Sequence, residues 1–82
     1  MKYQVPVIVE PLKEGGYYAE CLSLPGCHVE GENYWEALEN LEDIIRIHIE
    51  GRLEFGDPLP PELIPVKDAS PFVVQLPVMV GA

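Results

Sequence analysis

Residues 16–38 constrain the fold more than any other part of the chain, because two strand-like runs, a turn and a helix start follow one another there. The stretch reads GYYAECLSLPGCHVEGENYWEAL. A Gly-Gly pair opens it, and Pro25-Gly26 divides it, with proline fixing φ and glycine permitting a positive φ. The sequence therefore predicts a strand over 17–22, a strand over 27–30 and a helix after them, which together form a compact β-β-α unit.

The predicted helix has Asn33 as its N-cap, because Glu36 follows three residues later and this spacing forms a capping box. In a capping box, both side chains accept hydrogen bonds from backbone N–H groups that have no partner within the helix. A step of about 100° per residue gathers the apolar side chains on one half of the helix. That half contains Ala37, Leu38, Leu41, Ile44, Ile45, His48 and Ile49. We expect this side to pack on the sheet, and Gly51 and Gly56 are the two candidate helix ends.

Alternating side chains predict two further strands outside this unit. The first covers residues 3–10 and contains Pro6, which cannot donate a ladder hydrogen bond, so we expect an edge position or a bulge there. The second covers residues 72–80, where Pro77 indicates an edge strand or a strand shared with another subunit. Between the helix and that last strand, the proline-rich residues 56–71 predict a stiff, extended connector.

The composition limits the kinds of partner that the chain can have. Eighty-two residues predict one domain over 1–82, with a small core. The formal net charge of −9 repels phosphate backbones, so we expect no direct binding to nucleic acid, and an acidic surface suits a basic partner protein. The apolar runs are too short to span a membrane, and only two cysteines are present, so we expect a cytoplasmic protein with reduced thiols.

Two sets of side chains suggest metal chemistry, and each has a simpler explanation. Zinc could use the thiols and imidazoles of Cys21, Cys27, His28 and His48, but the spacing lacks close ligand pairs and His28 alternates to the face opposite Cys27. His48 is more simply a hydrogen-bonded residue at the margin of the core. A nucleophilic cysteine would need a nearby base and an electropositive setting, which this acidic chain offers little of.

A divalent metal could instead use a carboxylate cluster made of Glu10, Glu20, Glu30 and Glu36, as nucleases do. The capping box already explains Glu36, and solvated strand positions explain the other three. We therefore expect no metal, no cofactor and no catalytic residue.

A protein-binding surface is the remaining possibility. One tyrosine of the Tyr17-Tyr18 pair must face outward, and Ile47 projects away from the apolar half of the helix. Such residues indicate a binding surface only if they join a larger patch. The candidates for that patch are Tyr18, Trp35, Ile47, Val73 and Met79.

The central stretch resembles the N-terminal domain of the HicB family of antitoxins. The family pattern is a Gly-Tyr-Tyr-Ala strand, a Pro-Gly-Cys turn, a glycine before the helix cap, and Glu-Ala-Leu. The residues that match it most directly, which we expect to serve the fold, are Gly16, Tyr17, Pro25, Gly26, Cys27, Gly31, Asn33, Glu36 and Ala37. Leu22-Ser23 stands where the family usually has Pro-Asp, and Asn33 replaces the usual Thr as the cap.

The resemblance implies an α+β protein with a partial ribonuclease-H-like fold, in the order β-β-β-α-β, with one helix packed on an antiparallel sheet. It implies binding and neutralisation of a small basic HicA-type toxin that cleaves messenger RNA. We further expect a homodimer or homotetramer, formed through sheet edges or the outer face of the last strand. Many relatives add a C-terminal DNA-binding domain, and this sequence ends at the last predicted strand, so we expect no operator binding. The alternatives are a degenerate metal-dependent nuclease and a structural or binding module of the family without a toxin.

Overall fold

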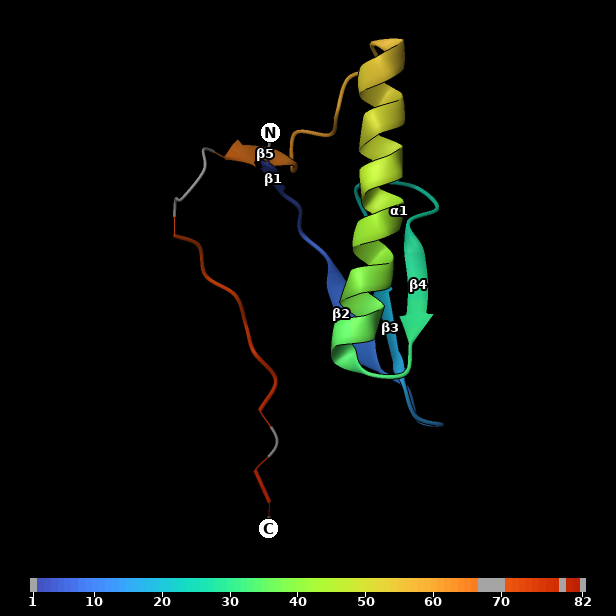
Figure 1. The fold of residues 1–82 in the computed structure, drawn as a ribbon, viewed down its shortest axis with the longest axis vertical. Coiled ribbons are helices and arrows are strands. Elements are labelled where there is room, and N and C mark those ends of the chain that lie inside the picture. Colours follow the sequence, from blue (N-terminus) through green and yellow to red (C-terminus); the bar gives the residue numbers. More distant parts are fainter. Residues whose placement is uncertain (1, 67–70, 79, 82) are drawn as a thin grey trace.

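The computed structural model describes residues 2–66, 71–78, 80 and 81. It is an α+β fold in which one helix packs on antiparallel strands (Figure 1). The elements are β1 (Lys2–Gln4), β2 (Ile8–Pro11), β3 (Tyr17–Glu20), β4 (His28–Gly31), α1 (Tyr34–Phe55) and β5 (Ile64–Val66). The predicted class and the helix-on-sheet packing are therefore confirmed.

Strands β2, β3 and β4 form one antiparallel sheet in the order β2-β3-β4. Ala19 of β3 lies opposite Val9 of β2 on one side and Val29 of β4 on the other. These three side chains face α1, which covers this side of the sheet (Figure 1). On the same side, Ala19 and Cys21 are buried and Tyr17 packs against the core.

The predicted strand over 3–10 is two strands that belong to different sheets. β1 pairs with β5, β2 pairs with β3, and residues 5–7 between them pair with neither. Pro6 lies at the centre of this interruption and has no N–H for a ladder. An edge position or a bulge was expected at Pro6, and the structure instead shows a complete break that divides the predicted strand into β1 and β2.

The predicted last strand over 72–80 is wrong for the described residues, because 71–78 and Val80 have no strand pairing. The strand after the helix is instead β5, which lies inside the predicted connector. β5 contains Pro65, which has no N–H to donate to a sheet. In the two-stranded sheet that β5 forms with β1, each strand is an edge strand, and edge strands tolerate proline. Val73, expected in the strand, is 94% exposed.

Both ends of α1 are capped as the sequence indicates. Asn33 Oδ1 accepts a hydrogen bond from the Glu36 N–H at 2.9 Å, and Glu36 Oε1 accepts one from the Glu32 N–H at 2.9 Å. At the other end, Gly56 has φ 74° and its backbone N–H bonds back to the helix, so Gly56, not Gly51, is the end of the helix.

The core lies between α1 and the sheet. Ala37, Leu41, Ile45 and Ile49 form the buried stripe of the helix, with successive members four residues apart. Ile44 was expected on the buried half of the helix, but it is 37% exposed at the edge of this stripe. The loop between β3 and β4 adds Leu24 and Cys27, and the chain after α1 adds Leu63, so side chains from distant segments close the core. The buried residues are Ala19, Cys21, Leu24, Cys27, Ala37, Leu41, Ile45, Ile49 and Leu63.

Gly31 allows the end of β4 to touch the first turn of α1. A Cβ added at Gly31 would meet the Ala37 backbone nitrogen and would lie 2.7 Å from the Ala37 Cα. No real Cβ tolerates such a contact with rigid backbone. The residue is therefore required for the helix to approach the sheet.

We expect Gly31→Ala to lower the free energy of unfolding by about 1–3 kcal/mol, because the strand and helix must move apart. Gly51→Ala is the matched control, since its Cβ would meet nothing within 4 Å inside α1. That change should raise the free energy of unfolding by about 0.5–1 kcal/mol through helix propensity. Urea denaturation followed by circular dichroism measures both, and equal effects of the two substitutions would contradict the close-contact explanation.

Candidate functional site

The side of the β2-β3-β4 sheet that faces away from α1 gathers carboxylates around one tyrosine. Tyr18 lies directly between Glu10 of β2 and Glu30 of β4, and the next row places Glu20 between Ile8 and His28. These side chains alternate with the inward Val9, Ala19 and Val29 row, so they share the opposite face. We call this surface the acidic sheet face: Ile8, Glu10, Tyr18, Glu20, His28 and Glu30.

Tyr18 has several contacts on the acidic sheet face. Its hydroxyl donates to Glu20 Oε2 at 3.3 Å, and its ring centroid lies 6.2 Å from that of His28. Reduced access to solvent, followed by the Glu20 carboxylate and then Glu10 and Glu30, raises the pKa of the Tyr18 phenol. A negative phenolate is disfavoured there because the surrounding groups already carry negative charge.

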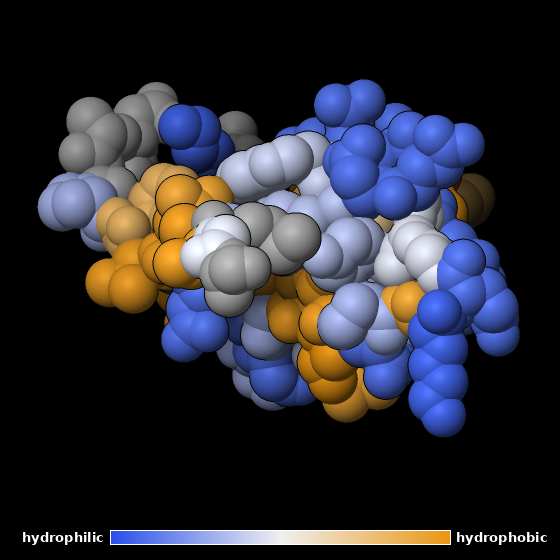
Figure 2. Space-filling view, turned by 90° about the horizontal axis from the view of Figure 1, so that it is seen from below, coloured by the Kyte–Doolittle hydropathy of each residue, from blue (hydrophilic) through white to orange (hydrophobic). Residues whose placement is uncertain are grey.

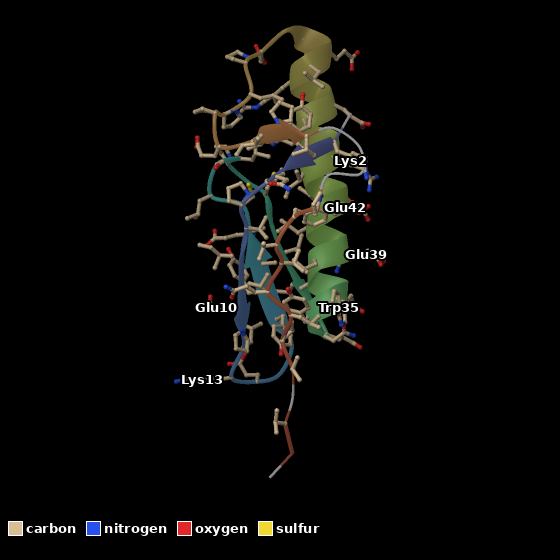
Figure 3. The ribbon with its side chains drawn as sticks, turned by 90° about the vertical axis from the view of Figure 1, so that its left-hand side faces the viewer. Lys2, Glu10, Lys13, Trp35, Glu39 and Glu42 are labelled. Carbon is tan, nitrogen blue, oxygen red and sulfur yellow. The ribbon has the colours of Figure 1, made fainter. Side chains whose placement is uncertain are left out.

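The acidic sheet face lacks basic residues of its own, because the sequences of β2, β3 and β4 contain no lysine or arginine. Within the described part of the chain, ion pairs join Arg46 to Glu42 and Asp43 on the helix, and none involves these strands. Figure 3 shows Glu10 on the sheet side of the molecule, with Glu39 and Glu42 on the opposite, helical side. The negative charge of the face is therefore available to a partner.

The nuclease alternative required Glu10, Glu20, Glu30 and Glu36 to converge. The structure brings the first three to one face, but Glu36 binds the Glu32 N–H at the start of the helix. Among the residues that the structure describes, no three His, Cys, Asp or Glu side chains are grouped closely enough to hold a metal ion. The expected capping role of Glu36 is confirmed.

Cys27 and His48 form a pair that the sequence did not reveal. Cys27 Sγ lies 3.6 Å from His48 Nδ1, and Cys27 is 3% exposed. Burial, followed by the neighbouring Cys21, raises the pKa of the Cys27 thiol. The thiol therefore stays protonated and enclosed, which is the opposite of an activated nucleophile. The predicted hydrogen-bonded role of His48 at the core margin is confirmed, and His28 lies on the other face, as expected.

The other candidate partner residues do not gather into one patch. Trp35 is 60% exposed beside the ring of Tyr34, and Ile47 is 68% exposed further along α1, whereas Tyr18 is half-buried on the acidic sheet face. Val73 lies on the C-terminal segment, and Met79 lies outside the described residues. The sequence missed Ile8 and His28 as neighbours of Tyr18, although their outward alternation was visible, because the register between strands was not.

The residues matched to the family pattern serve the fold in the structure. Gly16 and Gly26 have φ values of 86° and 83°, and Pro25 precedes Gly26 in the exposed turn. Tyr17 packs edge-on against Tyr34, with ring centroids 6.1 Å apart. The other matched residues lie where the helix starts and where the core closes, as described above: Cys27, Gly31, Asn33, Glu36 and Ala37. In the described residues, no helix has the length and apolarity needed to cross a membrane.

We expect Glu20→Gln to lower the pKa of the Tyr18 phenol, because it removes one negative charge and the carboxylate that accepts the phenol proton. A titration of ¹³Cζ-labelled tyrosine by NMR measures this, with Tyr18→Phe assigning the resonance. Glu39→Gln on the far side of α1 is the control and should leave the pKa unchanged. An unchanged pKa in Glu20→Gln would show that the two groups do not interact.

The buried Cys27 thiol predicts a loss of stability in alkali. Its folded-state pKa is raised, so the unfolded chain releases the thiol proton first, and the free energy of unfolding falls as pH rises above the ordinary thiol value. Denaturation between about pH 8 and pH 10 should show a smaller fall in Cys27→Ala than in the unsubstituted protein. Equal slopes would mean that Cys27 does not contribute.

Known proteins resemble this chain along most of its length. A UPF0150 protein of Synechocystis sp. is 37% identical over 68 residues, which cover 83% of this chain and 86% of that protein. A UPF0150 protein of Thermoplasma acidophilum is 35% identical over 60 residues, covering 73% of this chain and 84% of that protein. An uncharacterized 14.9 kDa protein of Haemophilus phage HP1 is 36% identical over 55 residues, and these cover 67% of this chain but 41% of the phage protein. No family model matches the chain. The two UPF0150 matches show that the chain belongs to the UPF0150 family.

Proposed function

We propose that this protein is a non-catalytic binding protein whose acidic sheet face binds a basic protein. The observation that carries the proposal is the arrangement of Glu10, Tyr18 and Glu30 in one row across three strands, with Glu20 bonded to the Tyr18 hydroxyl. A rigid sheet holds these groups in a fixed pattern. Nothing basic on the three strands competes with a partner for them.

The chemistry of the face suits a partner rich in lysine and arginine. Carboxylates on a surface of a protein with net charge −9 speed the approach of a basic protein and select against acidic ones. Tyr18 supplies an aromatic ring at the centre, and tyrosine is among the residues that most often dominate binding energy at interfaces. Ile8, which is 47% exposed at the margin, adds apolar area.

The resemblance to HicB antitoxins identifies the class of partner that we propose: a small basic HicA-type toxin that cleaves messenger RNA in the cytoplasm. A surface that binds RNA must itself be basic, and the acidic sheet face would compete with RNA for it. Inhibition of this kind requires burial of the toxin surface and no chemistry from the binder. The same proposal leaves the buried Cys27 and the capping Glu36 in purely structural roles.

A metal-dependent nuclease is the second candidate, because Glu10, Glu20 and Glu30 do share one face. They lie side by side on the pleated surface and lack a fourth carboxylate from the helix. Purified protein with Mg²⁺ or Mn²⁺ and a labelled RNA tests this directly. Cleavage that disappears in Glu10→Gln and Glu20→Gln would overturn the proposal of a non-catalytic binder.

The binding proposal predicts that Glu10→Lys and Glu30→Lys each weaken the complex about tenfold or more, because each places a positive charge beside Tyr18. The partner to test is any small basic protein that a neighbouring gene encodes, co-expressed with this chain and then titrated by calorimetry. Glu39→Lys changes net charge equally on the far side of the molecule and serves as the control (Figure 3).

The position of the charge decides the outcome of this experiment. Equal losses in Glu10→Lys and Glu39→Lys would mean that net charge, and not the acidic sheet face, governs association. Tyr18→Ala should weaken binding in both low and high salt, whereas the charge reversals should matter less in high salt. A purified neighbour that does not bind at all would leave the chain as a module of the family without a toxin and would overturn the antitoxin assignment.

A further inference from the structure

The two edges of the β2-β3-β4 sheet differ in how they are covered. At the β4 edge, the Asn40 side chain of α1 donates to the Glu30 carbonyl at 3.1 Å, so an acceptor that a further strand would use is already bonded. At the other edge, β2 pairs only with β3 within the described residues. A strand edge with unbonded N–H and C=O groups is a template for an additional strand. Such a strand is therefore accepted at β2 rather than at β4.

The hydrogen-bond pattern shows which backbone groups of β2 face outward. The Leu12 N–H bonds to the Gly16 carbonyl at 2.9 Å, which continues the register of β2 with β3. Every second pair of an antiparallel ladder exchanges hydrogen bonds, so Glu10 directs its backbone groups at β3 and Val9 directs its own away from the sheet. Val7 follows the same alternation. We call the outward backbone groups of Val7 and Val9 the open edge.

An apolar hollow of about 610 Å³ borders the open edge. Tyr34 and Leu38 of α1 line it from below, and residues 73–77 form the wall opposite β2. The Tyr34 hydroxyl donates to the Gln75 carbonyl at 3.2 Å and holds this wall. Figure 2 shows hydrophobic residues gathered at the left, where the C-terminal segment lies. Every residue that lines the hollow is uncharged, so an apolar side chain can enter it without desolvating a charge.

The outer side of the same edge is negative. Side chains alternate along a strand, so the residue of an added strand that lies opposite Val9 would point into the hollow. The next residue would lie beside Glu10, on the acidic sheet face. A lysine or arginine there would form a favourable cross-strand pair with the carboxylate. The open edge is thus suited to a strand in which basic and apolar side chains alternate.

We propose that the basic partner adds an extended segment of alternating basic and apolar residues to the open edge as an antiparallel strand. This inference rests on the proposed function and names the part of the partner that the site takes. Backbone hydrogen bonds dock the segment, and its side chains give specificity. Pro6 and Pro11, which lack an N–H, lie at either end of the open edge and keep the added strand short.

A second copy of this chain does not supply such a segment. No two lysine or arginine residues lie two positions apart in the sequence, so basic side chains would not recur on one side of a strand. The net charge of −9 also repels another copy from the acidic sheet face. The occupant of the open edge is therefore a different, basic protein.

Peptides separate the effect of the residue pattern from the effect of charge. The probe is the end-blocked peptide Lys-Val-Lys-Val-Lys, titrated into ¹⁵N-labelled protein and followed by NMR, and the matched control is Lys-Lys-Lys-Val-Val. We expect the alternating peptide to protect the Val7 and Val9 amides from hydrogen exchange. It should bind at least about tenfold more tightly than the control. Equal affinities would overturn the proposal, because charge alone would then account for binding.

Methylation of the peptide backbone tests the hydrogen bonds without altering the protein. In antiparallel addition the peptide valine opposite Val9 exchanges hydrogen bonds with it, so methylation of the valine nitrogens should weaken binding at least about fivefold. The lysine N–H groups point away from β2, and methylation of the lysine nitrogens should leave the affinity nearly unchanged. Equal effects of the two methylations would contradict strand addition.

Charge reversals distinguish this inference from the proposed function. Glu10 lies beside the open edge and Glu30 lies two strands away, so Glu10→Lys should weaken the alternating peptide more than Glu30→Lys does. Equal weakening would place the peptide across the acidic sheet face, which overturns strand addition and leaves the proposed function standing. A peptide that does not bind at all would also overturn strand addition, while calorimetry with the whole partner still decides the proposed function.

Discussion

The contact between Gly31 and the first turn of α1 determines how the rest of the molecule is arranged. Because Gly31 has no side chain, the end of β4 and the Ala37 backbone approach closely, and the capping pair Asn33 and Glu36 turns the chain between them. The helix then runs along the strands and covers one side of the sheet (Figure 1). Its stripe from Ala37 to Ile49 meets the inward row of Val9, Ala19 and Val29, and this burial supplies most of the hydrophobic driving force of the small core.

The packing of α1 on one side of the sheet also determines which side chains lie on the other side. Once Ala19 faces the helix, Tyr18 and Glu20 must face outward, and the antiparallel register adds Glu10 and Glu30 to the same row. The chemistry of the outer face is thus a geometric consequence of the packing inside. The same packing buries Cys27, and it holds the half-buried His48 against it at the margin of the core.

Much of the β-β-α unit could be predicted from local chemistry, and the remainder depended on pairing between distant segments. Asn33 and Glu36 identify the helix start, and Pro25-Gly26 identifies the turn, because these residues act on their immediate neighbours. The strand at Ile64–Val66 was missed because its prolines indicate an extended connector, and its pairing with Lys2–Gln4 has no local signal. The strand predicted over 72–80 is wrong for the described residues, because alternation shows which side chains share a face but cannot specify an edge with which the segment pairs. For the site, outward alternation indicates Tyr18, while the row Glu10-Tyr18-Glu30 requires knowledge of the register.

The pairing of β1 with β5 has a consequence for how the chain folds. Strands β2, β3, β4 and the start of α1 meet through short connections, whereas Lys2 and Val66 are joined only after the whole intervening chain has been ordered. The entropy of closing that long loop must be met before the small two-stranded sheet contributes anything in return. We therefore expect the β2-β3-β4-α1 unit to form first, and the β1-β5 sheet to be the last to assemble and the first to open.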